Sequence, residues 1–177
     1  MLVWSLRKLR PINSMSDPIG IMSGKRGLIM GVANERSIAW GIAQAIALAG
    51  GEMAFTYQGE AFEKRVRPLA EGVGSDIVLE CDVEKEGSVK QVFNSLAKDW
   101  KSIDFIVHSL AFSDKNELNG RYIDTTFENF KRTMKISCFS LTEIVQFAYP
   151  MMKDNGASVV TLSYLGAERV LPNYNVM

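Results

Sequence analysis

Two tyrosines near the end of the chain, Tyr164 and Tyr174, are side chains whose type and spacing could serve catalysis. A phenol hydroxyl has a reference pKa of about 10, so it remains a hydrogen-bond donor at neutral pH. A donor held in place can stabilise negative charge that develops on a substrate oxygen. Either tyrosine alone is more typical of a packing residue. The pair lies ten residues apart around a Gly-Ala-Glu-Arg segment, and this arrangement favours a role in a reaction.

A second chemical feature is the glycine-hinged turn between Gly31 and Gly41. The residues before it, 27–30, form a short apolar run that predicts a buried strand, and those after it adopt helical spacing. A strand that enters a helix through such a turn presents unpaired N–H groups and the positive end of a helix dipole, which suit a pyrophosphate. Ala33 and Arg36 occupy places where the G-x-G-x-x-G motif has glycines, so an ordinary strand-turn-helix remains an alternative.

Polar residues also follow later predicted strands, at Gln58, Asp82 and His108. Ligands of parallel sheets bind at the carboxyl ends of the strands, and all three residues lie at such ends. An aspartate after a strand is more often a turn or capping residue. Histidine titrates near neutral pH, which invites a catalytic role, but we interpret His108 as a structural group.

The elements that must position these residues alternate between strands and helices, which predicts an α/β fold with right-handed crossovers. We expect one domain built on a doubly wound, Rossmann-like parallel sheet that is incomplete at its C-terminus. Pro68 is expected to interrupt or bend the second helix, and a capping box at 125–128 to open the longest one. Expected strands are 27–30, 53–57, 76–80, 105–107 and 157–162; expected helices are 37–49 (with Ile38, Ile42 and Ile46 four apart), 62–69, 89–100 and 125–152.

Composition excludes several classes of function. The 177 residues include 20 basic and 20 acidic side chains without a long run of one sign, which argues against nucleic acid or an anionic membrane as principal partner. The two cysteines, Cys81 and Cys138, favour a reduced, cytoplasmic setting over a disulfide scaffold. One histidine and no C-x-x-C pair argue against a metal site. No apolar run approaches the roughly 20 residues of a membrane span, so we expect a soluble protein.

The first residues differ from the rest. Residues 1–22 carry Arg7, Lys8 and Arg10 and have no acid before Asp17. They are interpreted as a disordered extension, which leaves 23–177 as a partial dinucleotide-binding reductase domain. The extension is either an arginine-bearing targeting segment or, as we favour, sequence upstream of a misassigned start.

Five stretches of the chain resemble the bacterial enoyl-acyl-carrier-protein reductases, a divergent branch of the short-chain dehydrogenase/reductase family. The resemblance covers the chain from about Gly24 to its last residue. It is most specific around Tyr164 and Tyr174. The stretches that carry it are 31–41, 54–58, 81–83, 107–109 and 161–169.

The resemblance implies a reductase of fatty-acid synthesis that transfers hydride from NADH to the β-carbon of a trans-2-enoyl thioester on acyl-carrier protein. It implies that Tyr174 stabilises the resulting enolate and that Tyr164 lies on the other side of the acyl pocket. Gln58 is placed beside the adenosine ribose, where an uncharged side chain favours NADH over NADPH. Lys64 and Arg65 keep NADPH as an alternative.

The resemblance also implies the remaining contacts and the assembly. Asp82 is placed at the adenine amino group, Ser109 and Leu110 near the riboses, and the loop 112–124 beside the substrate. A cytoplasmic homotetramer is expected. The implied cofactor-binding residues are Gly31, Ser37, Ile38, Gln58, Asp82, Val83, Ser109 and Leu110, and Ser113 is the implied substrate-binding residue.

The chain departs from the family pattern at its end. Family members carry a ribose-binding lysine seven residues after the tyrosine that matches Tyr174, which would be position 181, beyond the last residue, Met177. We therefore expect the chain as given to be inactive and weakly stable. Two alternatives stay open: another short-chain reductase that acts on a carbonyl, and a non-catalytic fragment that binds nucleotide.

Overall fold

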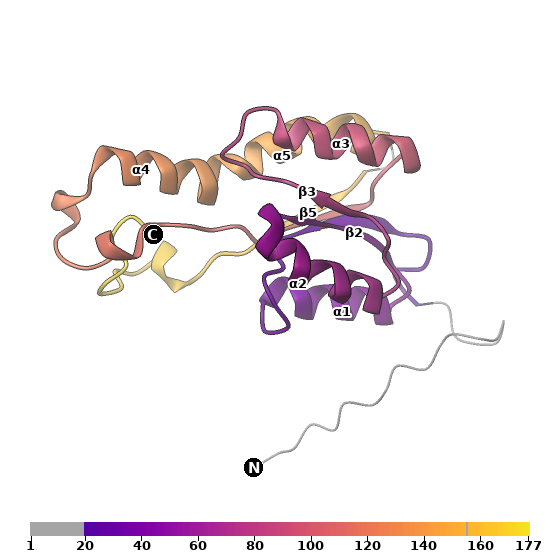
Figure 1. The fold of residues 1–177 in the computed structure, drawn as a ribbon, viewed down its shortest axis with the longest axis horizontal. Coiled ribbons are helices and arrows are strands. Elements are labelled where there is room, and N and C mark those ends of the chain that lie inside the picture. The colour runs from indigo at the N-terminus through magenta and orange to yellow at the C-terminus, as the bar shows by residue number, and fades with distance from the viewer. Residues whose placement is uncertain (1–19, 155) are drawn as a thin grey trace, which may run out of the picture.

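The computed structural model describes residues 20–154 and 156–177. Its centre is a parallel sheet of five strands in the order β3-β2-β1-β4-β5 (Figure 1). This is the doubly wound α/β architecture that the sequence predicts, and each strand lies near its expected range. The strands are β1 (Arg26–Met30), β2 (Glu52–Tyr57), β3 (Val78–Glu80), β4 (Phe105–His108) and β5 (Ser158–Thr161).

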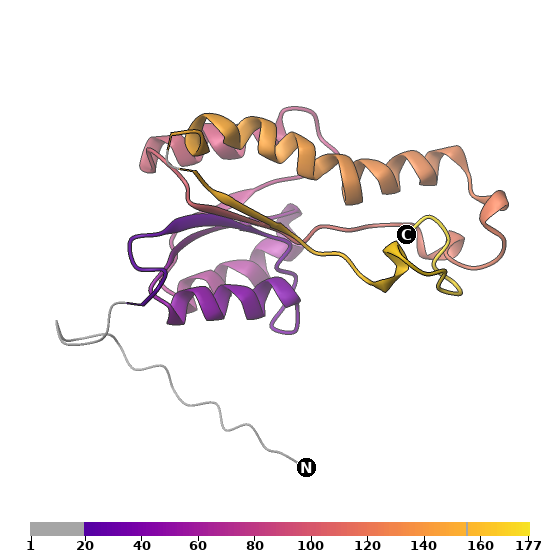
Figure 2. The same cartoon turned by 180° about the vertical axis from the view of Figure 1, so that it is seen from behind.

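Helices cover both faces of the sheet (Figures 1 and 2). One face packs against α1 (Ile38–Leu48) and α2 (Gly59–Gly72), and the other against α3 (Ser88–Asp99) and α5 (Ser140–Met152). Side chains of a strand alternate between faces. Leu28 and Met30 of β1 therefore join the core with α3 and α5, whereas Ile29 joins the core with α1 and α2.

Helix α1 begins after its predicted N-cap, Ser37, and its most buried residues are not the isoleucines whose spacing indicated the helix. Ala39, Trp40 and Ala43 are buried, whereas Ile38 is 67% exposed. The isoleucine spacing therefore indicated a helix correctly, and Ile42 and Ile46 pack partly buried against the core. Ala39 and Ala43 have small side chains, which let the helix lie close to the sheet.

Helix α2 runs without a break through Pro68, so the predicted interruption is wrong. Proline removes one backbone donor, but its ring here lies on the exposed side of the helix. Val66 and Ala70 on the opposite side are completely buried. Packing of that side holds the helix together across the missing hydrogen bond.

The long helix is composite. It consists of α4 (Phe127–Met134), a π-helical segment η3 (Lys135–Phe139) and α5. Its N-cap is Thr126, whose Oγ1 accepts from the backbone N–H of Asn129 at 3.2 Å. The predicted capping box is wrong in both members: it would have Thr125 as N-cap and Glu128 as its partner, whereas Thr126 is the N-cap and Glu117 supplies the carboxylate that bonds its N–H. A carboxylate from the preceding loop thus performs the role that the local motif assigned to the helix.

Strand β5 occupies one edge of the sheet and pairs only with β4. Beyond it, the C-terminal segment extends to the same end of the molecule as α4, which projects past the sheet (Figures 1 and 2). Of the predicted extension 1–22, residues 1–19 lie outside the described part, and Met22 donates a backbone hydrogen bond to Ala49 O. Among the described residues, no helix has the length and apolar character needed to cross a membrane.

Candidate functional site

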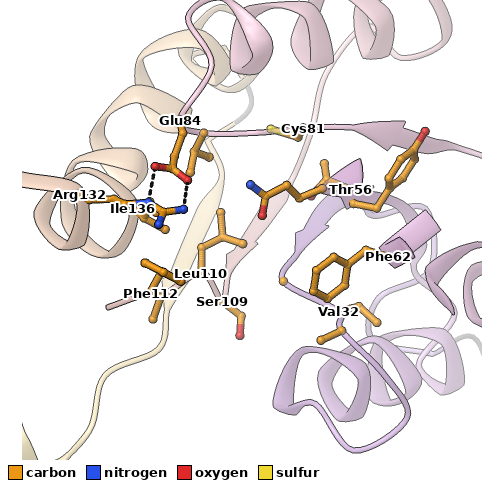
Figure 3. Close-up of a pocket in the computed structure, with 16 residues that line it drawn as sticks. Val32, Thr56, Phe62, Cys81, Glu84, Ser109, Leu110, Phe112, Arg132 and Ile136 are labelled. Carbon is orange, nitrogen blue, oxygen red and sulfur yellow. Dashed lines mark hydrogen bonds and ion pairs between the residues drawn. The ribbon is translucent and has the colours of Figure 1, made fainter. Parts of the chain in front are cut away.

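A cavity of about 460 Å³ opens where β1, β2, β3 and β4 end. Figure 3 shows side chains from these four exits around one space, with Arg132 and Ile136 of the long helix on the far wall. The fold therefore gathers five of the eight implied cofactor-binding residues: Gly31, Gln58, Val83, Ser109 and Leu110. The complete lining is Gly31, Val32, Ala33, Thr56, Tyr57, Gln58, Phe62, Cys81, Val83, Glu84, Ser109, Leu110, Ala111, Phe112, Arg132 and Ile136.

Gly31 is required by the closeness of two strand exits. Its φ is +94°, a conformation that L side chains rarely adopt. A Cβ at this position would lie 1.9 Å from the carbonyl oxygen of Ser109, and the Ser109 N–H donates to Met30 O at 3.1 Å. The glycine thus lets the β1 and β4 exits lie side by side at the floor of the cavity.

Ser37 shapes the loop that follows Gly31 and does not line the cavity. Its hydroxyl donates to Asn34 O at 2.6 Å and accepts from the Ala33 N–H at 3.4 Å. Ser37 makes no side-chain bond to the first turn of α1. Within that turn the Trp40 N–H donates to Ser37 O at 3.0 Å, which leaves the N–H groups of Ile38 and Ala39 available to an anion. Ile38 is exposed and does not line the cavity.

Gln58 lies at the end of β2, on the cavity wall, where it is the N-cap of α2. Lys64 and Arg65 do not reach this cavity. They line a different hollow, between α2 and the loop 34–36, and Lys64 pairs with Glu60 at 2.6 Å. The end of β2 therefore presents uncharged polar side chains to this cavity, namely Thr56, Tyr57 and Gln58.

The β3 exit presents Val83 to the cavity and keeps Asp82 outside its lining. The Asp82 carboxylate accepts from the Glu84 N–H at 3.0 Å, as a turn residue does. Cys81 lines the cavity, and burial raises the pKa of its thiol to about 12. A thiol with such a pKa is a poor nucleophile, so this exit supplies shape and not covalent chemistry.

An ion pair on the cavity wall was missed by the sequence analysis. Arg132 donates twice to the carboxylate of Glu84, with both N–O distances 2.7 Å, and its guanidinium lies 4.2 Å from the ring centre of Phe112. Lys135 Nζ donates to Glu84 O at 2.7 Å. The Arg132 hydrogen bonds hold the pKa of Glu84 below its usual value. Residues 48 apart carry no spacing signal, so the pattern could not reveal this pair.

Ser113 lies next to this wall but is bonded into the protein. Thr133 Oγ1 donates to Ser113 Oγ at 3.0 Å, and the Ser113 hydroxyl lies 3.4 Å from Asn129 Oδ1. Asn129 and Thr133 are buried polar residues of α4. The hydroxyl of Ser113 thus has protein partners and lines neither of the cavities described here.

The two tyrosines contact each other in a separate cavity near the C-terminus. Their ring centroids are 5.6 Å apart, and Tyr164 and Tyr174 are 41% and 46% exposed. Asn175 holds this segment to the loop before α4, because its Nδ2 donates to Glu117 O at 2.9 Å. Among the described residues, this cavity, also about 460 Å³, shares no lining residue with the first.

Comparison with known proteins decides the family. Residues 31–177 match the family model described as enoyl-(acyl carrier protein) reductase. This chain belongs to that family. It is 60% identical over 158 residues to enoyl-[acyl-carrier-protein] reductase [NADH] 2 of Rhizobium meliloti (strain 1021), which aligns 89% of this chain with 59% of the relative. It is 52% identical over 158 residues to the Rickettsia felis enoyl-[acyl-carrier-protein] reductase [NADH] FabI, with 89% and 60% covered.

Solved reductase structures share the fold. The crystal structure of FabI from Candidatus Liberibacter asiaticus superposes with a TM-score of 0.87 at 52% identity, over 90% of this chain and 62% of that one. The Anaplasma phagocytophilum reductase in complex with NAD gives 0.84 at 55% identity, over 88% and 59%. The chain therefore spans about 60% of the length of the curated relatives it matches. The predicted family and fold class are confirmed.

Proposed function

We propose that this chain carries the nucleotide-binding part of an NADH-dependent enoyl-[acyl-carrier-protein] reductase of fatty-acid synthesis. The observation that supports this most is the single cavity at the carboxyl ends of four parallel strands, in a chain of this family. The relatives from Rhizobium meliloti and Rickettsia felis are named as NADH enzymes, and the Anaplasma phagocytophilum structure holds NAD.

The cavity fits a dinucleotide. Gly31 lets the β1 and β4 exits meet at the floor of the cavity, and the start of α1 offers the N–H groups of Ile38 and Ala39 to the pyrophosphate. In this proposal Gln58 bonds the adenosine ribose, and the 82–83 corner holds the adenine. Ser109 and Leu110 lie along the riboses. Ser37 contributes by holding the loop, and Ile38 through its backbone at the helix start.

The chemistry of the protein is the stabilisation of charge. NADH supplies a hydride for the β-carbon of a trans-2-enoyl thioester. Negative charge then develops on the thioester oxygen, and in this proposal the Tyr174 hydroxyl donates a hydrogen bond to that oxygen. Tyr164 lies on the other side of the acyl chain, and Ser113 belongs to the loop beside it. Acyl-carrier protein delivers the substrate.

A second candidate is nucleotide binding without turnover by this chain. It is favoured by the separation of the two cavities, since the tyrosines share no lining residue with the proposed NADH pocket among the described residues. For hydride transfer, a substrate bound beside the tyrosines would have to come within about 3–3.5 Å of the nicotinamide of a bound NADH, because reacting atoms must approach to that distance.

One experiment separates these candidates. The purified chain is titrated with NADH and NADPH by calorimetry, and NADH oxidation is followed with a short trans-2-enoyl thioester and, as control, a 3-oxoacyl thioester. Oxidation with the enoyl thioester supports the reductase, and binding without oxidation supports the second candidate. Oxidation with the 3-oxoacyl thioester alone would indicate a carbonyl reductase. Absence of binding would contradict every nucleotide-based proposal.

We also propose that the protein acts as a cytoplasmic homotetramer when extended to the length of its relatives. Support comes from apolar side chains left exposed along the composite helix, which suit a subunit interface. Size-exclusion chromatography with light scattering of the extended form tests it. The exposed residues are Phe127, Phe130, Met134, Phe139 and Tyr149.

A further inference from the structure

The geometry points to a positioning role for His108. Its imidazole is held in a single tautomer, with the hydrogen on Nε2, and its two hydrogen bonds connect the composite helix to the end of β5. His108 is the last residue of β4 and is 1% exposed. Its Nε2 lies 2.8 Å from Ser140 Oγ, and its Nδ1 lies 2.9 Å from Thr161 Oγ1. One imidazole thus connects the first residue of α5 with the last residue of β5.

The direction of each hydrogen bond follows from the last acceptor in the chain. Ser140 Oγ lies 2.6 Å from the carbonyl oxygen of Ile136, and a carbonyl can only accept. The single hydroxyl hydrogen of Ser140 is used there, so Ser140 must accept from His108. The hydrogen of the ring is therefore on Nε2, and Nδ1 of the neutral ring accepts from the hydroxyl of Thr161.

The π segment makes that last acceptor available. In an α-helix the Ser140 N–H would bond the Ile136 carbonyl, four residues earlier. At the end of η3 it bonds Lys135 O instead, five residues earlier. The Ile136 carbonyl is left to the Ser140 hydroxyl, and the irregularity in the helix thereby fixes the orientation of a histidine 28 residues earlier in the chain.

The imidazole is suited to this task because it stays neutral. Burial lowers the pKa of His108, so at pH 7 the ring keeps one donor and one acceptor nitrogen. The backbone of the same residue adds a second attachment, since the Leu162 N–H donates to His108 O at 3.2 Å. Thr161 belongs to the exposed edge strand, so these two bonds hold the point from which the chain departs toward Tyr164.

The tautomer can be observed directly because His108 is the one histidine of the sequence. The chain is labelled with ¹⁵N-histidine, without a polyhistidine tag, and long-range ¹H–¹⁵N spectra are recorded at pH 7. We expect one imidazole signal set with a protonated Nε2 and an unprotonated Nδ1. A protonated Nδ1, an even mixture of tautomers or an imidazolium would overturn the assignment. Ser140→Ala removes the acceptor and is expected to let both tautomers appear.

The positioning role is tested by hydrogen exchange. Thr161→Val keeps the shape of the side chain and removes its hydroxyl, and is expected to speed exchange of the Leu162 amide about tenfold, as for loss of one hydrogen bond. Ser158→Ala is the matched control, because it removes a hydroxyl from the other end of β5. Equal exchange in the two variants would overturn the role. Neither measurement involves a nucleotide, so this inference and the proposed function can fail separately.

Discussion

The two cavities of this reductase-family chain are held in opposite ways. The proposed NADH pocket lies over the middle of the sheet, where β1 and β4 are buried and Gly31 contacts the backbone of the next exit. The tyrosine cavity lies beyond the edge strand, on half-exposed side chains tied down by Asn175. The first is built by the packing of the core, and the second by a few surface contacts.

This difference implies that the two cavities respond differently to substitution. A substitution in the proposed NADH pocket also disturbs the packing of the core. It should therefore reduce both NADH binding and the free energy of unfolding. A change at the tyrosines should alter chemistry and leave nucleotide binding and the fold intact.

Gly31→Ala should abolish NADH binding and destabilise the fold by roughly 3 kcal/mol or more, since it adds positive-φ strain and a backbone clash. Calorimetry and urea unfolding measure the two effects. Gly41→Ala is the matched control: nothing lies within 4 Å of its Cβ in α1, so alanine should stabilise the helix by up to about 1 kcal/mol. Retained NADH binding in Gly31→Ala would contradict the assignment of the pocket.

Tyr174→Phe, made in a form extended to the length of the relatives, should lower turnover on a trans-2-enoyl thioester about a hundredfold. The hydroxyl is required only when charge develops, so the dissociation constant of NADH should change less than about twofold. Steady-state kinetics and calorimetry on the same preparation give both numbers. Unaltered turnover would remove Tyr174 from the mechanism.

Gln58→Arg should shift the preference between cofactors toward NADPH by about tenfold, because a guanidinium bonds a 2′-phosphate bidentately. The ratio of the dissociation constants for NADH and NADPH measures it. Arg65→Gln serves as the comparison, since Arg65 faces the other hollow and should leave the ratio unchanged. An unchanged ratio in Gln58→Arg would show that Gln58 is not beside the ribose.

Glu84→Gln and Arg132→Met should each weaken NADH binding up to about fivefold, as a partly exposed ion pair contributes at most about 1 kcal/mol. The exchanged pair, Glu84→Arg with Arg132→Glu, should recover part of the loss. Arg121→Met is the control, because it breaks an exposed ion pair with Asp124 that lies away from the pocket. Equal effects of Arg121→Met and Arg132→Met would remove this wall from nucleotide binding.

His108 should make a small contribution to the dependence of stability on pH. Burial lowers its folded-state pKa, so the unfolded chain binds the proton more readily below its reference pKa of about 6.5. The free energy of unfolding should therefore fall by up to about 1 kcal/mol between pH 7.5 and 5.5. Urea unfolding at the two pH values measures this change. His108→Gln should remove the contribution of His108 to the pH dependence of the unfolding free energy, even if the variant differs from the parent in stability at pH 7.5.

The sequence predicted what depends on local pattern. Short apolar runs located the five strands, and helical spacing located the helices between them. The alternation of strands and helices predicted the parallel sheet. The rule that ligands lie at strand ends was applied to Gln58, Asp82 and His108, and of these only Gln58 lines the cavity. Val83 and Ser109, which line the same cavity, were implied by the family resemblance. The strand and helix patterns are repeated along the chain, so a single sequence is sufficient to find them.

The features that escaped prediction depend on residues far apart in sequence. Glu117 caps α4 from a loop, and Glu84 meets Arg132 across the cavity, although neither pair has a local motif. The π segment was missed because its sequence remains compatible with an ordinary helix. The predicted interruption at Pro68 was wrong for the opposite reason. Proline is a strong local signal for a helix break, but packing of the buried side of α2 keeps the helix continuous.

The order of the strands has a consequence for synthesis on the ribosome. In the sheet, Gly27 of β1 pairs with Phe105 of β4. One edge of β1, the first strand to be synthesised, therefore has no partner until residues 78 positions later have been translated. At roughly 5–20 residues per second that interval is about 4–16 s, during which an apolar strand edge is open to other nascent chains. Closure of the sheet by β4 should therefore be the step at which chaperone capacity matters most to this protein.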